Sequence, residues 1–326
     1  MNQIEHYPAY RYVDVHAHFI TDKYRKAALA AGHNRPDGMP AIPEWNIQET
    51  LGVMDRMNIQ TAILSVSSPG IHFGDNLAAR RLARTVNEEG AGFVRDHPGR
   101  FGLFASLPLP DMSGALEELA FAMDHLKAEG IVLETNFHGI YLGDDRLETL
   151  FSELDKRHAV VFIHPTSASC PCCQTLSLGY PRPMLEFMFE TTRSVTNLIL
   201  SGVTIRYPNV KIIVPHAGAA LPVLADRVAG LMPILGLKNT FHEEDLFAQL
   251  KRLYYDLAGT PLPRLLPALL TFANPDQIMY GSDYPFSSEK LVHTLIRKLE
   301  NSNLGDSQLK SFMRDNALRL FPGLRR

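Results

Sequence analysis

Cysteine is scarce in this sequence of 326 residues, and all of it lies in one place. The three cysteines, Cys170, Cys172 and Cys173, belong to the stretch SCPCC. An odd number of clustered cysteines is a poor framework for disulfides, and no second Cys or His pair follows at the spacing of a zinc finger. We therefore expect reduced thiols in a loop.

Long apolar runs and an excess of one charge are missing as well. No apolar run approaches the ~18–20 residues that span a bilayer. The N-terminal stretch MNQIEHYPAYRY lacks the basic start and the apolar core of a signal peptide, so we expect a cytoplasmic protein. The 32 Lys and Arg residues nearly balance the 35 Asp and Glu residues, for a net charge of −3. This balance gives no electrostatic reason to expect nucleic acid or an anionic membrane as a partner.

Short β-branched runs recur along the chain, each followed by a longer amphipathic stretch. These runs are nearly continuous in apolar residues, which is typical of buried parallel strands. The eight expected strands are residues 11–19, 61–67, 101–109, 130–136, 159–165, 211–218, 252–259 and 277–286. Because we find no internal repeat, low-complexity tract or linker, we expect one domain over residues 1–326.

Eight strand-then-helix units predict a (β/α)8 TIM barrel, with a terminal helix at residues 306–320. The alternative is an open doubly wound sheet, but no GxGxxG follows the first strand. Two connections are longer than a barrel needs. They are residues 20–46, which are rich in Gly and Pro and hold the only tryptophan, and residues 166–182, which hold the cysteines. Both leave the carboxyl ends of strands, where barrel enzymes build their active sites, so we expect binding loops or lids.

Five side chains that can bind a metal or transfer protons stand at the ends of four expected strands. His16 and His18 end the first strand in VDVHAHF, His164 the fifth, His216 the sixth, and Asp283 the eighth in GSDYPF. The two-residue spacing places His16 and His18 on the same face of a strand. A lone histidine at a strand end is more often a hydrogen-bonded core residue than a ligand. In a barrel, however, all five side chains would meet at the same mouth.

These five side chains are chemically coherent as a metal site. Three imidazoles and one carboxylate suit a borderline divalent cation such as zinc, with one position left for water or substrate. A cation of this kind would lower the pKa of its water towards ~7. The remaining histidine could act as a general acid or base, because its unperturbed pKa lies near neutrality. Four residues would then bind the metal and one would transfer protons.

The complete pattern resembles the amidohydrolase superfamily. HxH after the first strand, His after the fifth and sixth, and Asp in GSDYPF carry this resemblance. The stretch RYPNVKIIVPHAGAALPVLADR is similar to the amidohydrolase-related decarboxylases, which include the aminocarboxymuconate-semialdehyde, γ-resorcylate and 6-methylsalicylate decarboxylases. The resemblance implies an amidohydrolase-type barrel with one divalent metal, zinc as first choice and manganese as second. It implies metal ligation by His16, His18, His164 and Asp283, and catalysis by His216 together with Asp283.

The fourth expected strand, GIVLETN, departs from the binuclear members of the superfamily. Those members carry a carboxylated lysine after this strand, whereas here the strand has Glu134 and no lysine. The departure favours a single metal. Glu134 is then either a residue that orients a neighbouring histidine or, as the weaker alternative, a further ligand.

Arg227, eleven residues beyond His216, matches an arginine of the muconate enzyme that binds a substrate carboxylate in the neighbouring subunit's site. A planar guanidinium suits that role, which implies a homodimer or higher homo-oligomer; a surface salt bridge is the alternative. Where that enzyme has arginines before the second strand, this sequence has Thr50 and Gly52. The missing second arginine favours a monocarboxylate substrate over a dicarboxylate.

Two further segments, PEWNIQETLGVMDRMNIQTAILSVSSPG and NFHGIYLGDDRLETLFSELDKR, are most similar to the 6-methylsalicylate decarboxylase subgroup. The resemblance therefore implies metal-dependent, non-oxidative decarboxylation of a small salicylate-type acid, with the ring proton delivered by Asp283 or His216. Trp45, Tyr284 and Phe286 are candidate walls for a flat aromatic substrate, with core packing as the alternative. Hydrolysis of a lactone, ester or amide, or hydration, is the competing activity of the same site, and a metal-binding scaffold without activity is the third interpretation.

Overall fold

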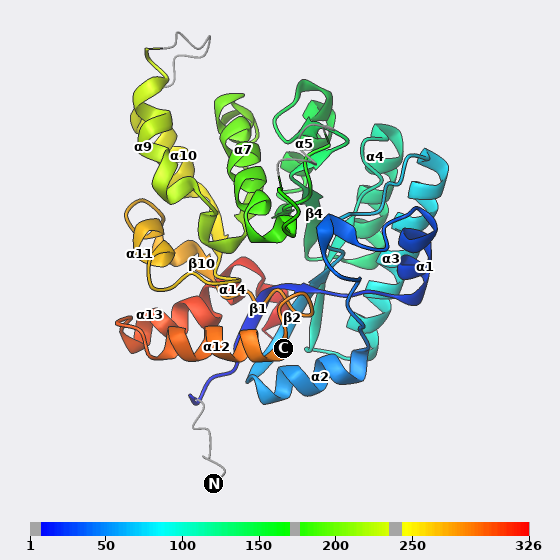
Figure 1. Cartoon of the computed structure of the whole chain (residues 1–326), viewed down its shortest axis with the longest axis horizontal. Coiled ribbons are helices and arrows are strands. Elements are labelled where there is room, and N and C mark those ends of the chain that lie inside the picture. The colour runs from blue at the N-terminus through cyan, green and yellow to red at the C-terminus, as the bar shows by residue number, and fades with distance from the viewer. Residues whose placement is uncertain (1–7, 170–176, 235–242, 326) are drawn as a thin grey trace.

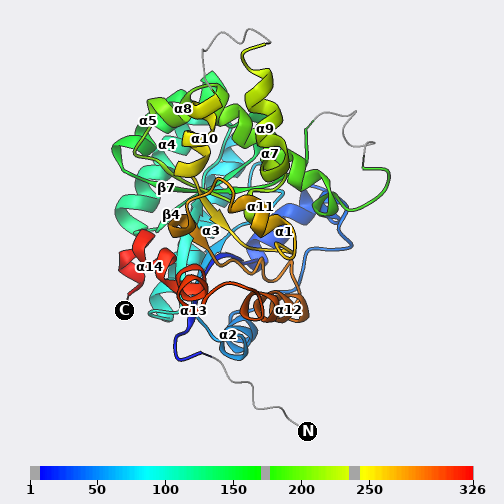
Figure 2. The same ribbon diagram turned by 90° about the vertical axis from the view of Figure 1, so that its left-hand side faces the viewer.

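Eight parallel strands occupy the centre of the molecule, and helices surround them, as Figures 1 and 2 show from two directions. The computed structural model describes residues 8–169, 177–234 and 243–325, so the three cysteines lie outside the described residues. In the order in which they pair, the strands are β1 (Tyr12–His18), β2 (Ile59–Ser65), β3 (Phe101–Ser106), β4 (Gly130–Glu134), β7 (Val160–His164), β8 (Lys211–Val214), β9 (Tyr254–Asp256) and β10 (Ile278–Met279). Every pair along this order is parallel. The predicted TIM barrel is confirmed.

The barrel closes where the first strand meets the segment that follows the last. The amide of Asp283 donates to the carbonyl of His16 at 2.7 Å, and the amide of His18 donates to the carbonyl of Tyr284 at 2.8 Å. Ala17 and Tyr284 form a parallel bridge at this seam. The seam therefore brings the first strand's histidines next to Asp283, although they are far apart in the sequence.

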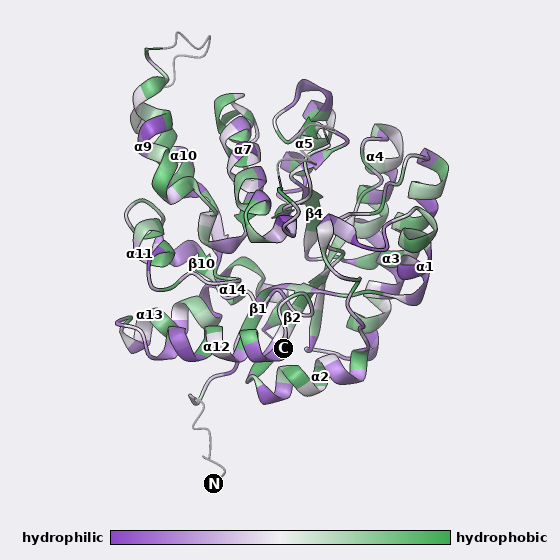
Figure 3. Ribbon diagram, in the orientation of Figure 1, coloured by the Kyte–Doolittle hydropathy of each residue, from purple (hydrophilic) through white to green (hydrophobic). Residues whose placement is uncertain are grey.

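Helices cover the outside of the barrel. They are α1 (Asp22–Ala30), α2 (Ile47–Arg56), α3 (Asn76–Asp96), α4 (Met112–Phe121), α5 (Glu148–Lys156), α7 (Glu186–Leu200), α8 (Val203–Arg206), α9 (Leu221–Leu231), α10 (Glu243–Arg252), α11 (Leu265–Leu269), α12 (Glu289–Glu300), α13 (Asp306–Lys310) and α14 (Asn316–Leu320). A π-helical turn, Ser311–Asp315, joins the last two, so the terminal helix predicted at residues 306–320 is present. Figure 3 shows that the outer helices mix hydrophilic and hydrophobic residues, as helices with one face on a core do. Within the described ranges, no helix has both the length and the apolar character to cross a membrane.

Two apolar layers hold the fold together. One lies between the strands and the surrounding helices, and the other fills the inside of the barrel. The inner layer includes Val13, Val15, Phe104 and Phe162, and Phe321, which follows α14, packs against Phe104 with ring centroids 5.8 Å apart. Apolar side chains fill the inside of the barrel up to the carboxyl ends of the strands. The polar side chains of the candidate site lie beyond this layer, at those carboxyl ends.

The connection after β1 contains a helix that the sequence did not predict. Thr21 caps α1 by accepting a hydrogen bond from the amide of Tyr24 at 3.2 Å, and Tyr24 and Ala28 bury one face of the helix. The Gly and Pro residues that marked residues 20–46 as a loop lie after this helix. Farther along, Asp37 accepts a hydrogen bond from the hydroxyl of Ser167, which ties this connection to the one after β7.

A short antiparallel pair, β5 (Asn136–Phe137) and β6 (Ile140–Tyr141), follows β4.

Candidate metal centre and adjoining cavity

The carboxyl ends of the strands carry the polar side chains of the candidate site. The last residues of β1, β2, β3, β4, β7 and β9 are His18, Ser65, Ser106, Glu134, His164 and Asp256. Because the strands are parallel, these residues meet at one mouth of the barrel. The ring of His16 stands directly on the apolar interior, edge to face with Phe162 at a centroid distance of 4.7 Å.

An irregularity in β1 turns its two histidines into the mouth. Between the pairs Asp14–Ala62 and Ala17–Leu64, β1 has one residue more than β2. An extra residue of this kind changes which side chains point inward. Val13 and Val15 belong to the inner apolar layer below the irregularity, whereas His16 and His18 face the mouth above it.

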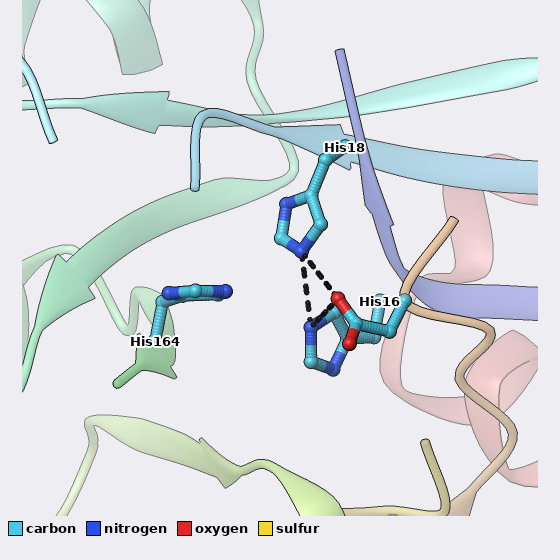
Figure 4. A group of neighbouring side chains, drawn as sticks. His16, His18 and His164 are labelled. Atoms are coloured by element: carbon cyan, nitrogen blue, oxygen red, sulfur yellow. Dashed lines mark hydrogen bonds and ion pairs between the residues drawn. The ribbon is translucent and has the colours of Figure 1, made fainter. Parts of the chain in front are cut away.

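Four predicted metal ligands lie close together. The nearest ligand atoms of His16, His18, His164 and Asp283 all fall within 4.8 Å of one another. Nε2 of His18 lies 3.1 Å from Nε2 of His16 and 3.1 Å from Oδ1 of Asp283, which is 3.5 Å from Nε2 of His16. Figure 4 shows the three imidazoles around a common space.

The outward nitrogens of the three imidazoles are held by the protein. The Nδ1 partners are Asp256 Oδ2 for His16 at 2.9 Å, Ser65 Oγ for His18 at 3.0 Å, and the Pro165 carbonyl for His164 at 2.8 Å. A proton on each Nδ1 leaves the Nε2 lone pairs free to face the common space. This is the arrangement by which outer partners fix the tautomer of a metal-binding histidine.

The donor set and its spacing fit a divalent cation. Two nitrogens bound to one zinc ion at about 2.0–2.1 Å lie about 2.9–3.4 Å apart, depending on the angle between them. The 3.1 Å separation between the Nε2 atoms of His16 and His18 falls within that range. Two facing lone pairs at this distance repel each other unless a proton or a cation lies between them. Three imidazoles and one carboxylate are ligands that zinc and manganese accept.

Burial and neighbouring charges set the protonation of these groups. Burial lowers the pKa of His18, and it lowers that of His164 well below its usual value. Burial alone would raise the pKa of Asp283, but hydrogen bonds with His16, His18 and His216 hold it well below its usual value. Burial would likewise lower the pKa of His16, but Asp256 and Asp283 outweigh it and raise the value to about 10. Asp283 is therefore an anion, and His18 and His164 are neutral, as metal ligands must be. His16 holds a proton between itself and the two carboxylates, and a cation that entered the group would displace the proton on its Nε2.

His216 follows β8 and faces the free side of Asp283. Its Nε2 lies 3.8 Å from Oδ2 of Asp283, and its buried Nδ1 has no hydrogen-bond partner among the described residues. The backbone here is strained, because His216, Ala217 and Ala219 all have positive φ, at 54°, 52° and 56°. The amide of His216 donates to Oδ1 of Asp256 at 3.0 Å. One carboxylate, that of Asp256, therefore positions both the ring of His16 and the backbone of His216.

A cavity of about 500 Å³ adjoins the metal group over the ends of β3, β4 and β7. Its volume is typical of small-molecule sites. The polar residues of its wall include His33, Arg35, Asp37, His72, Glu134, His138, Thr166 and Arg182. The Oε2 atom of Glu134 lies 3.7 Å from Nδ1 of His164, which connects the cavity to the metal group. Burial raises the pKa of Glu134 well above its usual value, and the charge of Asp37 adds to the shift.

The predicted substrate-binding residues fall in different places. The ring of Phe286 lies 5.4 Å from that of His18, at the metal group. Trp45 packs on two phenylalanines of the outer apolar layer, and Tyr284 lies close to acidic residues of α2 and α12. Arg227 is exposed on α9. None of these four residues lines the 500 Å³ cavity.

Three residues of the mouth were missed by the sequence analysis. Asp256 is the last residue of β9 and lies within the expected strand 252–259, close to its end, which is the positional signal that singled out the histidines. Arg35 and Arg182 line the cavity from the two long connections, and nothing in their spacing marks them as site residues. Position at a strand end could therefore have found Asp256, but not the arginines.

Comparison with known proteins places the chain among similar sequences and structures. The family model described as amidohydrolase matches residues 13–323. Decarboxylase yanB of Aspergillus niger is 37% identical over 323 residues, which cover 95% of this chain and 87% of that protein. The 6-methylsalicylic acid decarboxylase acuB of Aspergillus aculeatus is 35% identical, with 96% of this chain and 97% of that protein covered. A crystal structure of an amidohydrolase II superposes with a TM-score of 0.89 at 34% identity, covering 95% of this chain and 99% of the other.

Proposed function

The chain belongs to the amidohydrolase family, and on that premise we propose that it is a metal-dependent decarboxylase of a small aromatic acid of the salicylate type. The observation that carries the proposal is the convergence of His16, His18, His164 and Asp283 beside a cavity of small-molecule size. The curated relatives support the reaction, since those at 34–37% identity are decarboxylases, and two of them act on 6-methylsalicylic acid. We therefore propose 6-methylsalicylate as the first substrate to test.

We propose that His16, His18, His164 and Asp283 hold one divalent cation, zinc as first choice and manganese as second. A bound cation supplies Lewis-acid polarisation to the carboxylate and the ortho oxygen of the substrate. The carboxylate of Asp283 divides its two oxygens between two tasks: Oδ1 faces the histidines of β1, and Oδ2 faces His216.

The protein's own residues then have to handle one proton. The bond between the ring and the carboxylate breaks, its electron pair stays on the ring carbon, and that carbon takes a proton as carbon dioxide leaves. We propose that the proton is held by His216 and Asp283, whose Nε2 and Oδ2 atoms lie 3.8 Å apart. His216 also stabilises the phenolate oxygen. The partly buried aromatic ring of Phe286 helps to exclude water beside His18.

We further propose that two copies associate and that Arg227 of each chain serves the other chain's cavity. A guanidinium on the surface of α9, outside its own chain's cavity, supports this role. Exposed apolar side chains on α7, on α9 and in the segment before α7 support an interface between the two copies. They are Tyr180, Met184, Leu185, Phe189 and Val223, whose exposed fractions are 42–70%.

The activity is tested by carbon dioxide release. The purified protein is stripped with a chelator, reloaded with zinc or manganese, and incubated with 6-methylsalicylate. We expect metal-dependent release of carbon dioxide together with the phenol, and a fall in kcat of about 100-fold or more in His216→Ala and Asp283→Asn. His125→Ala, at an exposed histidine outside the mouth, is the control and keeps the wild-type rate. Undiminished release in both site variants, or hydrolysis of lactones without carbon dioxide, would contradict the proposal.

A further inference from the structure

Glu134 brings an acid to the wall of the cavity. It is the last residue of β4 and pairs with His164 across the strands, so both side chains enter the mouth. Only 10% of its side chain is exposed. The carboxyl group packs against Gly70, where a Cβ atom would lie 3.4 Å from Cγ and Oε1 of Glu134. Gly70 therefore borders the acid at van der Waals distance, and its φ of +74° is a conformation that glycine adopts readily.

One oxygen of this acid is unsatisfied. Oε2 of Glu134 is buried and has no hydrogen-bond partner among the described residues. The nearby Nδ1 of His164, at 3.7 Å, already donates to the carbonyl of Pro165 at 2.8 Å. The other acid of the cavity wall differs, because Asp37 accepts a hydrogen bond from Ser167. Buried acceptors are nearly always paired, so the exception at Glu134 marks a place that a ligand completes.

The rest of the wall suits an aromatic ring. Leu107, Leu109 and Phe137 give the cavity an apolar surface on the same side of the barrel as Glu134. A flat ring lying on this surface could bring a substituent to Oε2 while its carboxylate stays at the metal group. Oε2 offers lone pairs both when the carboxyl group is charged and when it carries a proton on Oε1, so the substituent that pairs with Oε2 is a hydroxyl and not a methyl or an ether, which have no proton to donate.

Resting on the proposed function, we propose that Glu134 determines substrate specificity: its Oε2 accepts a hydrogen bond from a phenolic hydroxyl of the aromatic acid. That hydroxyl is either the one ortho to the carboxylate or a second one on the ring. A site built to pair with a hydroxyl rejects analogues that lack it, because its own polar group is then left unpaired. The enzyme therefore favours, among its aromatic substrates, those with a hydroxyl donor at the ring position that reaches β4.

The test compares Glu134→Leu and Glu134→Gln on two pairs of compounds. Salicylate and 2-methoxybenzoate differ at the ortho hydroxyl, and 2,6-dihydroxybenzoate and 6-methylsalicylate differ at the second position. For each compound we measure kcat/KM from carbon dioxide release and the dissociation constant by calorimetry. Glu134→Leu keeps the volume without the acceptor, and we expect a loss of about 10- to 100-fold for the hydroxyl member of one pair and little change for the other member. The pair that responds identifies the hydroxyl, and Glu134→Gln, which keeps an acceptor oxygen, restores part of the loss.

A matched control variant and the metal content of Glu134→Leu distinguish loss of a contact with the substrate hydroxyl from general damage to the fold or the metal group. Glu190→Gln removes another buried carboxylate, one that accepts from the hydroxyl of Tyr141 at 2.6 Å and lies outside the cavity wall; all four compounds should stay within about twofold. Equal losses for all four compounds in Glu134→Leu, or loss of its metal, would overturn the proposal. If the wild type releases no carbon dioxide from any compound, the proposed function fails, and the dissociation constants still decide the role of Glu134.

Discussion

Replacement of Asp256 by Asn tests how the metal group is held in place. The carboxylate accepts three hydrogen bonds: Oδ1 from the amides of His216 and Ala258 at 3.0 and 2.9 Å, and Oδ2 from Nδ1 of His16 at 2.9 Å. Asn keeps the shape and the oxygen that accepts from the two amides. It places an NH2 group opposite the Nδ1–H of His16, so two donors face each other.

The imidazole of His16 can relieve this conflict only by moving its proton or turning away. A proton on Nε2 would point into the space between His16 and His18, whose Nε2 atoms are 3.1 Å apart, and would remove one metal ligand. Loss of an outer partner of this kind typically lowers metal affinity by about 10- to 100-fold. That range corresponds to about 1.4–2.8 kcal/mol of binding free energy.

The assay is a competition for zinc against a chelator of known affinity, with circular dichroism as a check on folding. Ser65→Ala is the matched control, because Nδ1 of His18 keeps the carbonyl of Ser65 at 3.3 Å after the hydroxyl at 3.0 Å is removed. We expect a change of less than about threefold in that variant. Wild-type zinc affinity in Asp256→Asn, or an equal loss in Ser65→Ala, would refute the reasoning.

Two further predictions concern stability and assembly. Asp111 caps α4 by accepting from the amide of Gly114 at 3.2 Å, and its carboxylate, which is 7% exposed, also accepts from Nε and Nη2 of Arg80. Asp111→Ala should therefore lower the free energy of unfolding in urea titrations at pH 7 by about 1 kcal/mol for the lost cap, with a further contribution from the lost ion pair. Arg80 lowers the pKa of Asp111 below its usual 3.8, so the stabilisation is present above that value and is lost as pH falls through the folded-state pKa; a gap between wild type and variant that widened in acid would contradict this. Arg227→Ala should raise KM about tenfold without changing the molar mass measured by light scattering, and a wild-type mass of 36.4 kDa, that of a single chain, would refute the shared site.

The barrel and the convergence of its strand ends could be predicted because both follow from the chain's simplest patterns. Continuous apolar runs indicate buried parallel strands, and parallel strands carry their last residues to the same mouth, which is where His16, His18, His164 and Asp283 lie. The HxH spacing placed two histidines on one face, but it could not say which face. That depends on the extra residue in β1, which only the pairing with β2 reveals.

The surroundings of the site were harder to predict because they depend on contacts between distant segments. Trp45 was a candidate substrate wall with core packing as the alternative, and it packs on the outer apolar layer. The same connection contains α1, which its Gly and Pro content concealed. Arg35 and Arg182 reach one cavity from connections that are far apart in the sequence. No local sequence pattern indicates that two such distant segments line the same cavity.

The seam between β1 and β10 also decides when the metal group can form in a newly made chain. His18 and Asp283 are 265 residues apart, so at 5–20 residues per second a ribosome takes roughly 13–53 s to pass from one to the other. During that interval the two histidines of β1 are half of a coordination sphere, with neither His164 nor Asp283 beside them until later parts of the chain emerge. On the proposed function, metal acquisition would be a late event of biogenesis, and a cation in the finished group would join the first strand to the segment that follows the last.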